Sequence, residues 1–144
     1  EPLATSFELQ GNGYVVESVG RLAGYIPYTC YSALESYIEK NPEIIQGFSN
    51  ALYEAMVWVD EHSAMEVAEV IQPQFADTDI EFLAKIVQTY RDLDAWNPDL
   101  VLGEDGYNRL IDIMKLAGEI EEGAPYSVIQ TPEFATKAKE NYKK

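Results

Sequence analysis

The hydrophobic pattern of this chain changes once, near residue 33, and that change limits the folds it can adopt. Before it, two short runs, residues 14–19 and 25–31, are rich in aromatic and β-branched residues and are preceded by glycines, as is typical of strands. Pro27 lacks an N–H group, so the second run belongs at an edge or a crossing point. Two strands alone make a marginal sheet. We therefore expect them to pair with strands outside this sequence or with a second copy of the chain.

From about Ala33 onward, apolar residues recur at three- and four-residue spacing, as on one face of a helix. Signals for helix starts occur at residues 41–42, 63–66, 78–81 and 131–132. Further helices are expected over residues 3–9 and 110–117, the latter ended by Gly118. The sequence thus predicts a mainly α chain with two or three short strands near its N-terminus. We infer that it is part of a larger α/β or α+β protein.

Composition narrows the classes of function. The chain has 144 residues, 47% of them hydrophobic, and its 25 Asp and Glu against 10 Lys and Arg give a net charge of −15. It is long enough for one domain and too apolar for a disordered polymer. The acidic excess argues against nucleic acid, whose phosphates attract clustered Lys and Arg. No stretch approaches the roughly 20 apolar residues of a membrane-spanning helix.

Residues with catalytic or metal-binding chemistry are few. His62 is the only histidine and has no ligand partners at helical spacing, so we expect it to interact with a helix C-terminus. Calcium loops starting at Asp77 or Asp92 would lack the required Gly at position six and Glu at position twelve. The single cysteine, Cys30, excludes an intrachain disulfide and a Cys-rich zinc site. No two carboxylates stand out as a catalytic pair. We expect no enzyme, metal or cofactor.

Tyrosines recur every third residue at positions 25, 28 and 31, and Tyr14 lies in the neighbouring strand-like run. Aromatic rings with polar tips line many small-ligand clefts. They also pack in protein cores, which composition alone favours here. Both interpretations stay open at this point.

A series of short motifs extends over nearly the whole chain. In sequence order they are Glu1-Pro2, Gly13-Tyr14-Val15-Val16, Ser18-Val19-Gly20, Ile26-Pro27-Tyr28-Thr29, Asn41-Pro42-Glu43, Gly47-Phe48, Asn50-Ala51-Leu52, Trp58-Val59 and Trp96-Asn97-Pro98. Together they resemble the latter half of an ABC-transporter substrate-binding protein of the nitrate/sulfonate/taurine and thiamine-pyrimidine precursor type.

The resemblance implies an α/β parent fold, the two-lobed periplasmic-binding-protein type II. Residues 1–27 would finish the second lobe, and residues 28–144 would supply the hinge crossing and the C-terminal helical part of the first lobe. Such a protein holds a small anion, sulfonate or pyrimidine-like solute between its lobes and delivers it to an ABC permease without chemistry. It would be extracytoplasmic, either periplasmic or membrane-associated as a lipoprotein.

By the same resemblance, Glu1, Tyr28 and Thr29 would face the ligand cleft. Cys30 departs from the small or β-branched residue expected after Tyr28-Thr29. The isolated chain should then self-associate through its unpaired strands. The alternative is an acidic helical protein-interaction module without ligand or catalysis, which would fold as a cooperative monomer.

Overall fold

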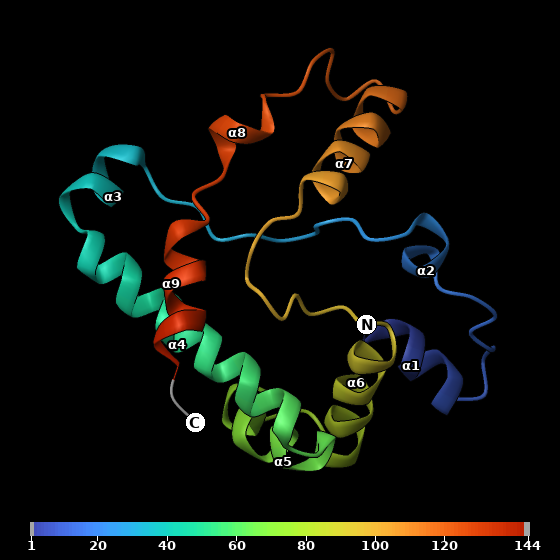
Figure 1. Cartoon of the computed structure of the whole chain (residues 1–144). Coiled ribbons are helices and arrows are strands. Elements are labelled where there is room, and N and C mark those ends of the chain that lie inside the picture. The colour runs from blue at the N-terminus through green and yellow to red at the C-terminus, as the bar shows by residue number, and fades with distance from the viewer. Residues whose placement is uncertain (1, 143–144) are drawn as a thin grey trace. The chain divides into compact units, whose positions relative to one another are not determined.

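The computed structural model describes residues 2–142, which are helical over most of their length (Figure 1). The helices are α1 (Leu3–Leu9), α2 (Val19–Ala23), α3 (Glu35–Lys40), α4 (Pro42–Glu61), α5 (Ala64–Ile71), α6 (Ile80–Asp92), α7 (Glu104–Leu116), α8 (Tyr126–Ile129) and α9 (Glu133–Asn141), with a 3-10 helix η1 (Gln72–Gln74). None of these described residues belongs to a strand. Nor does any helix among them combine the length and the apolar composition of a membrane span.

The two strand-like runs therefore differ from expectation. Residues 14–18 have irregular backbone and lead into α2, and residues 25–34 form a long uncoiled segment (Figure 1). A strand persists only when a neighbouring strand accepts and donates its backbone hydrogen bonds. Within residues 2–142 neither run has such a neighbour, so both keep a strand-forming sequence without strand structure.

The chain divides into two compact units, Glu1–Leu22 with Met56–Asn97, and Ala23–Ala55 with Pro98–Lys144. The helix α4 contributes its last turns to the first unit and the rest to the second. The division after residue 27 implied by the resemblance concerns the lobes of a whole two-lobed protein. It stays a prediction.

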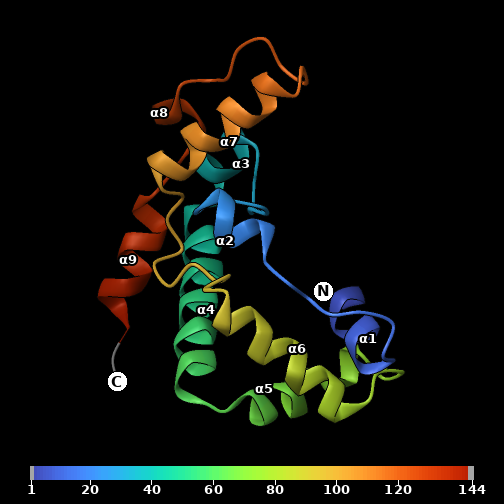
Figure 2. The same ribbon diagram turned by 90° about the vertical axis from the view of Figure 1, so that its right-hand side faces the viewer.

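In the first unit, α5 and α6 lie side by side (Figures 1 and 2). Their contact buries Ala68, Leu83 and Ala84, with Ile71 and Ile80 packed against these three residues. Small alanines on both helices allow a close approach, and the leucine fills the space between them. This contact is the core of the unit.

Nearby side chains accept hydrogen bonds from the backbone N–H groups at the N-terminal ends of α5 and α6. The predicted capping box of α5 is present, because Ser63 Oγ accepts from the Glu66 N–H and the Glu66 carboxylate accepts from the Ser63 N–H. At α6 the cap is Asp79 rather than Thr78, since the Asp79 carboxylate accepts from the Phe82 N–H at 3.0 Å. The helix accordingly begins at Ile80, one residue later than the sequence pattern predicts.

Side chains also form hydrogen bonds with backbone carbonyls at the C-terminal end of α4. The Arg91 guanidinium donates to the carbonyls of Val59 and His62. The His62 ring stacks on Trp58 at 4.1 Å, and its Nδ1 lies 2.7 Å from the Trp58 carbonyl. The histidine thus lies at a helix C-terminus, as the sequence predicts, and helps to satisfy carbonyls that have no partner within the helix.

The Ser63–Glu66 capping box gives a pH-dependent prediction. Its hydrogen bonds from the Ser63 hydroxyl and N–H lower the pKa of the Glu66 carboxyl. A carboxylate with a lowered folded-state pKa stabilises the fold above its unfolded value of 4.5, and this contribution is lost as the pH falls through the folded-state pKa. We expect Ser63→Ala to cost about 1 kcal/mol of unfolding free energy at pH 7. The difference from the wild type should shrink in urea titrations below pH 4.5. An unchanged difference at acidic pH would contradict the role of Glu66.

In the second unit, α4 and α9 run beside each other (Figures 1 and 2), and Gln46 donates to the Phe134 carbonyl at 3.0 Å. The rings of Tyr53 and Tyr142 pack edge to face at 5.6 Å. Ala135 and Ala138 of α9 are buried. The Lys139–Asp99 ion pair is half exposed, so it adds little stability.

The buried core is small for such an apolar chain. Among residues 2–142, seven hydrophobic side chains are buried, and no large side chain is fully enclosed. Many large apolar side chains are exposed instead, including most of those in residues 14–34. Extended apolar surface of this kind is typical of interaction sites and ligand-binding grooves.

Candidate functional site

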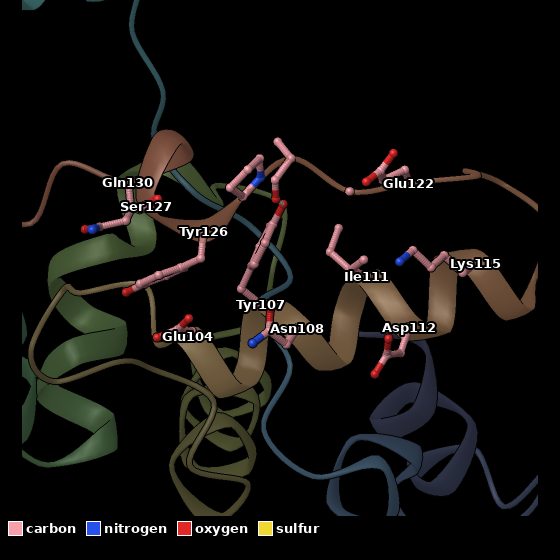
Figure 3. Close-up of a pocket in the computed structure, with 13 residues that line it drawn as sticks. Glu104, Tyr107, Asn108, Ile111, Asp112, Lys115, Glu122, Tyr126, Ser127 and Gln130 are labelled. Carbon is pink, nitrogen blue, oxygen red and sulfur yellow. Dashed lines mark hydrogen bonds between the residues drawn. The ribbon is translucent and has the colours of Figure 1, made fainter.

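A groove in the second unit lies between one face of α7 and the segment 122–130, which includes α8 (Figure 3). Its volume is about 610 Å³, within the range of small-molecule pockets. The α7 side is lined by Glu104, Tyr107, Asn108, Ile111, Asp112 and Lys115, whose spacing places them along one side of the helix. The facing side is formed by residues 122–127 and Gln130.

Two tyrosines fix the walls of the groove. Tyr107 Oη donates to the Ala124 carbonyl at 2.7 Å, and Tyr126 Oη donates to the Leu102 carbonyl. Their ring centroids are 6.0 Å apart. Figure 3 shows Tyr107 rising from α7 between Ile111 and Tyr126. Because both hydroxyls are bound to backbone, the tyrosines offer a ligand mainly their ring surfaces.

The turn that faces Ile111 of α7 requires a glycine at position 123. A Cβ atom at position 123 would lie 2.8 Å from two carbons of Ile111, closer than side-chain atoms pack. Gly123 therefore lets the backbone of the segment approach Ile111 directly. This approach closes one part of the groove wall.

The polar groups of the groove are mixed in charge. Three exposed carboxylates and one ammonium line it: Glu104, Asp112, Glu122 and Lys115. Gln130 Oε1 is buried and has no hydrogen-bond partner among the described residues, so it can accept from a donor. The arrangement can bind a small molecule that combines an apolar body with hydrogen-bond donors. Residues 2–142 hold no group of three or more His, Cys, Asp or Glu side chains placed to bind a metal ion.

Two of the three predicted ligand residues lie outside the groove. Glu1 lies outside the described residues. Tyr28 and Thr29 are exposed in the uncoiled segment 25–34, and neither lines the groove. The side chain of Tyr28 is 99% exposed.

The tyrosines at positions 25, 28 and 31 have different roles. Tyr25 packs against Gly106 of α7, and the Tyr31 ring contacts Phe48 edge to face at 4.9 Å. Tyr28, by contrast, is almost fully exposed. The periodic spacing therefore combines two packing residues with one that remains available to a ligand or to another segment.

The sequence pattern does not predict the groove. The sequence of α7 is that of an ordinary amphipathic helix. The groove forms only because residues 122–130 fold back over one face of this helix. The signal that could have indicated it is the pair Tyr107 and Tyr126 on either side of the Gly123-Ala124-Pro125 turn.

Comparison with curated proteins gives a match along nearly the whole chain. Over 137 residues the chain is 35% identical to "Putative binding protein YtlA" of Bacillus subtilis (strain 168). The match covers 95% of this chain but 41% of that protein, so the chain spans about two fifths of the length of the curated relative that it matches. No protein-family profile matches the sequence, and no solved structure matches it. The chain is thus similar to part of the protein that bears this name.

Proposed function

We propose that this chain is part of the solute-binding component of an ABC importer. The protein would hold a small anion, sulfonate or pyrimidine-like solute between two lobes and pass it unchanged to a permease. It would act outside the cytoplasm, as a periplasmic protein or a membrane-associated lipoprotein. The observation that carries this proposal is the 35% identity over 137 residues to "Putative binding protein YtlA".

The exposed pair Tyr28 and Thr29 supports a specific mode of binding. Two hydroxyl groups can donate hydrogen bonds to the oxygens of an anion, and the phenol ring can stack on a planar heterocycle. Both side chains are exposed in the structure and are free to face a second lobe. A transported solute is released unchanged, so the site needs complementary donors and shape rather than a nucleophile or a base.

The groove beside α7 is the competing location for the solute. It lies in one unit, its tyrosine hydroxyls are already bound, and three of its four charged groups are carboxylates. That charge disfavours an anionic solute. We therefore place the solute at Tyr28 and Thr29 rather than in the groove.

The test is a thermal-shift screen of the full-length protein with nitrate, taurine, other sulfonates and substituted pyrimidines, followed by calorimetric titration of each hit. A Tyr28→Ala/Thr29→Val double variant should weaken the binding of the hit at least about tenfold, the effect of losing one to two kcal/mol of contacts. Gln130→Ala in the groove should leave the affinity unchanged. If Gln130→Ala weakens binding and the double variant does not, the solute binds in the groove.

The screen also separates the two classes of function. If no member of these solute classes binds the full-length protein, the importer assignment fails. The acidic helical interaction module then becomes the better account of the exposed apolar side chains. That module predicts a monomer whose apolar faces bind another protein, which light scattering and pull-down with defined partners would show.

A further inference from the structure

The turn that follows α1 contains the dipeptide Asn12-Gly13. The chain reverses here because Gly11 adopts a positive φ of 70°, and the N–H groups of Gly11 and Asn12 donate to the carbonyls of Glu8 and Phe7 at 3.0 Å each. These are the two hydrogen bonds of a Schellman motif, which ends a helix at a glycine. Backbone hydrogen bonds thus hold the chain as far as Asn12, and irregular backbone follows (Figure 1).

The backbone of Gly13, by contrast, is unrestrained. Within residues 2–142 its N–H donates no hydrogen bond, and a Cβ atom at this position would meet nothing within 4 Å. The neighbouring Asn12 is exposed, and its side-chain amide donates to Gln10 Oε1 at 3.0 Å. A side-chain amide next to a free, unhindered backbone nitrogen supplies both groups for an intramolecular ring closure, and glycine allows the backbone to adopt the required geometry.

We propose that Asn12 is a site of spontaneous deamidation. The Gly13 nitrogen attacks Cγ of the Asn12 side chain, so that a new C–N bond closes a succinimide ring while the bond from Cγ to Nδ2 breaks. The nitrogen leaves as ammonia and takes the proton that the Gly13 nitrogen loses. Water then opens the ring at one of its two carbonyls, which gives either aspartate or isoaspartate. Water is the only co-reactant.

The other five asparagines lack one of these features. Asn41 and Asn97 precede prolines, whose nitrogens carry no proton to lose. Asn50 and Asn108 lie inside α4 and α7, where each backbone N–H donates to the carbonyl four residues before it. Asn141 is the last residue of α9, and the N–H that follows it donates back into the helix at 3.1 Å. The structure thus distinguishes the turn after α1 from the other asparagine sites.

Deamidation changes the contacts of this turn. The new carboxylate would face Gln10 Oε1, which is an acceptor, where the amide now donates a hydrogen bond. Gln10 is itself held in place, because its side-chain amide donates to Ser6 Oγ at 2.9 Å. The added charge also lies near the C-terminal end of α1, where unpaired carbonyls disfavour a negative group. Isoaspartate further adds one carbon to the backbone, so the modification removes a contact from the turn and lengthens it.

Peptide mapping of the full-length protein by mass spectrometry, after prolonged incubation near neutral pH, tests the proposal. We expect conversion of Asn12 to be at least about tenfold faster than that of Asn50 and Asn108, with isoaspartate among the products. Conversion no faster than that of the helical asparagines would overturn the proposal. Aspartate without isoaspartate would overturn it as well, because direct hydrolysis of the side-chain amide gives aspartate alone.

A pair of glycine variants isolates the ring closure. Gly13→Ala fits the fold, since its Cβ meets nothing within 4 Å and the φ of Gly13 is not positive. The added Cβ stiffens the backbone and hinders the attacking nitrogen, so conversion of Asn12 should slow about tenfold or more. Gly47→Ala, whose Cβ also meets nothing within 4 Å, should leave the rate at Asn12 unchanged. An unchanged rate in Gly13→Ala, or equal slowing in both variants, would contradict the proposal.

Discussion

Replacing Leu83 with alanine is expected to lower the free energy of unfolding of the α5–α6 unit by about 3 kcal/mol. Leu83 is 3% exposed and is the one large side chain among the three buried residues of this helix contact. The other two are Ala68 and Ala84, which have no side-chain length with which to fill the space that the leucine leaves. Because the alanines cannot fill it, we expect a cavity that Ile71 and Ile80, which pack against this contact, fill only in part.

Val70→Ala is the matched control for Leu83→Ala. Val70 lies on α5 but is 62% exposed, so its truncation should change the unfolding free energy by no more than about 0.5 kcal/mol. Urea titrations followed by circular dichroism at 222 nm would measure both variants, with a separate fit for each transition if the two units unfold independently. A Leu83→Ala protein as stable as Val70→Ala would mean that α5 and α6 do not form the core.

The helices follow from local sequence, and this explains why they could be predicted. The Ser63–Glu66 capping box is complete within four residues, and Gly118 adopts the positive φ that ends a helix. The one-residue shift at α6 has a local cause too, because the Asp79 carboxylate reaches the Phe82 N–H. Each of these signals needs no distant partner.

The strand-like runs and the groove depend on parts of the chain that are far apart or outside it. Tyr14 and Val16 have a strand-forming sequence, but a strand needs a partner that residues 2–142 do not supply. The groove depends on the hydrogen bond from Tyr107 to the Ala124 carbonyl, seventeen positions away. The family resemblance predicts that Tyr28 faces a ligand, and this exposed side chain can be tested for that role in the full-length protein.

The second large effect concerns Gly106, which anchors the segment 25–34. We expect Gly106→Ala to destabilise the protein by about 1–2 kcal/mol, although alanine favours a helix interior over glycine by about 1 kcal/mol. The added Cβ would lie 2.7 Å and 2.9 Å from two carbons of the Tyr25 ring, so the ring and Pro27 must move away from α7. The hydrogen bond from Arg109 to the Tyr25 carbonyl would weaken as the segment shifts.

Gly47→Ala is the control with the opposite expected sign. Gly47 lies within α4, and a Cβ atom there would meet nothing within 4 Å. The substitution should therefore stabilise the protein by about 0.5–1 kcal/mol through helix propensity and the lower entropy of the unfolded chain. Thermal and urea unfolding of both variants would show whether contact with Tyr25 reverses the usual effect of glycine replacement.

A double-mutant cycle then identifies the Tyr25 ring as the cause. In a Tyr25→Ala background the atoms closest to the new Cβ are gone, and the 3.3 Å contact with Pro27 Cδ remains. Gly106→Ala should then be neutral or slightly stabilising, which gives a coupling free energy of about 1–2 kcal/mol between positions 25 and 106. If Gly106→Ala is equally destabilising in both backgrounds, the ring does not pack on α7. The segment 25–34 would then lack its anchor on α7.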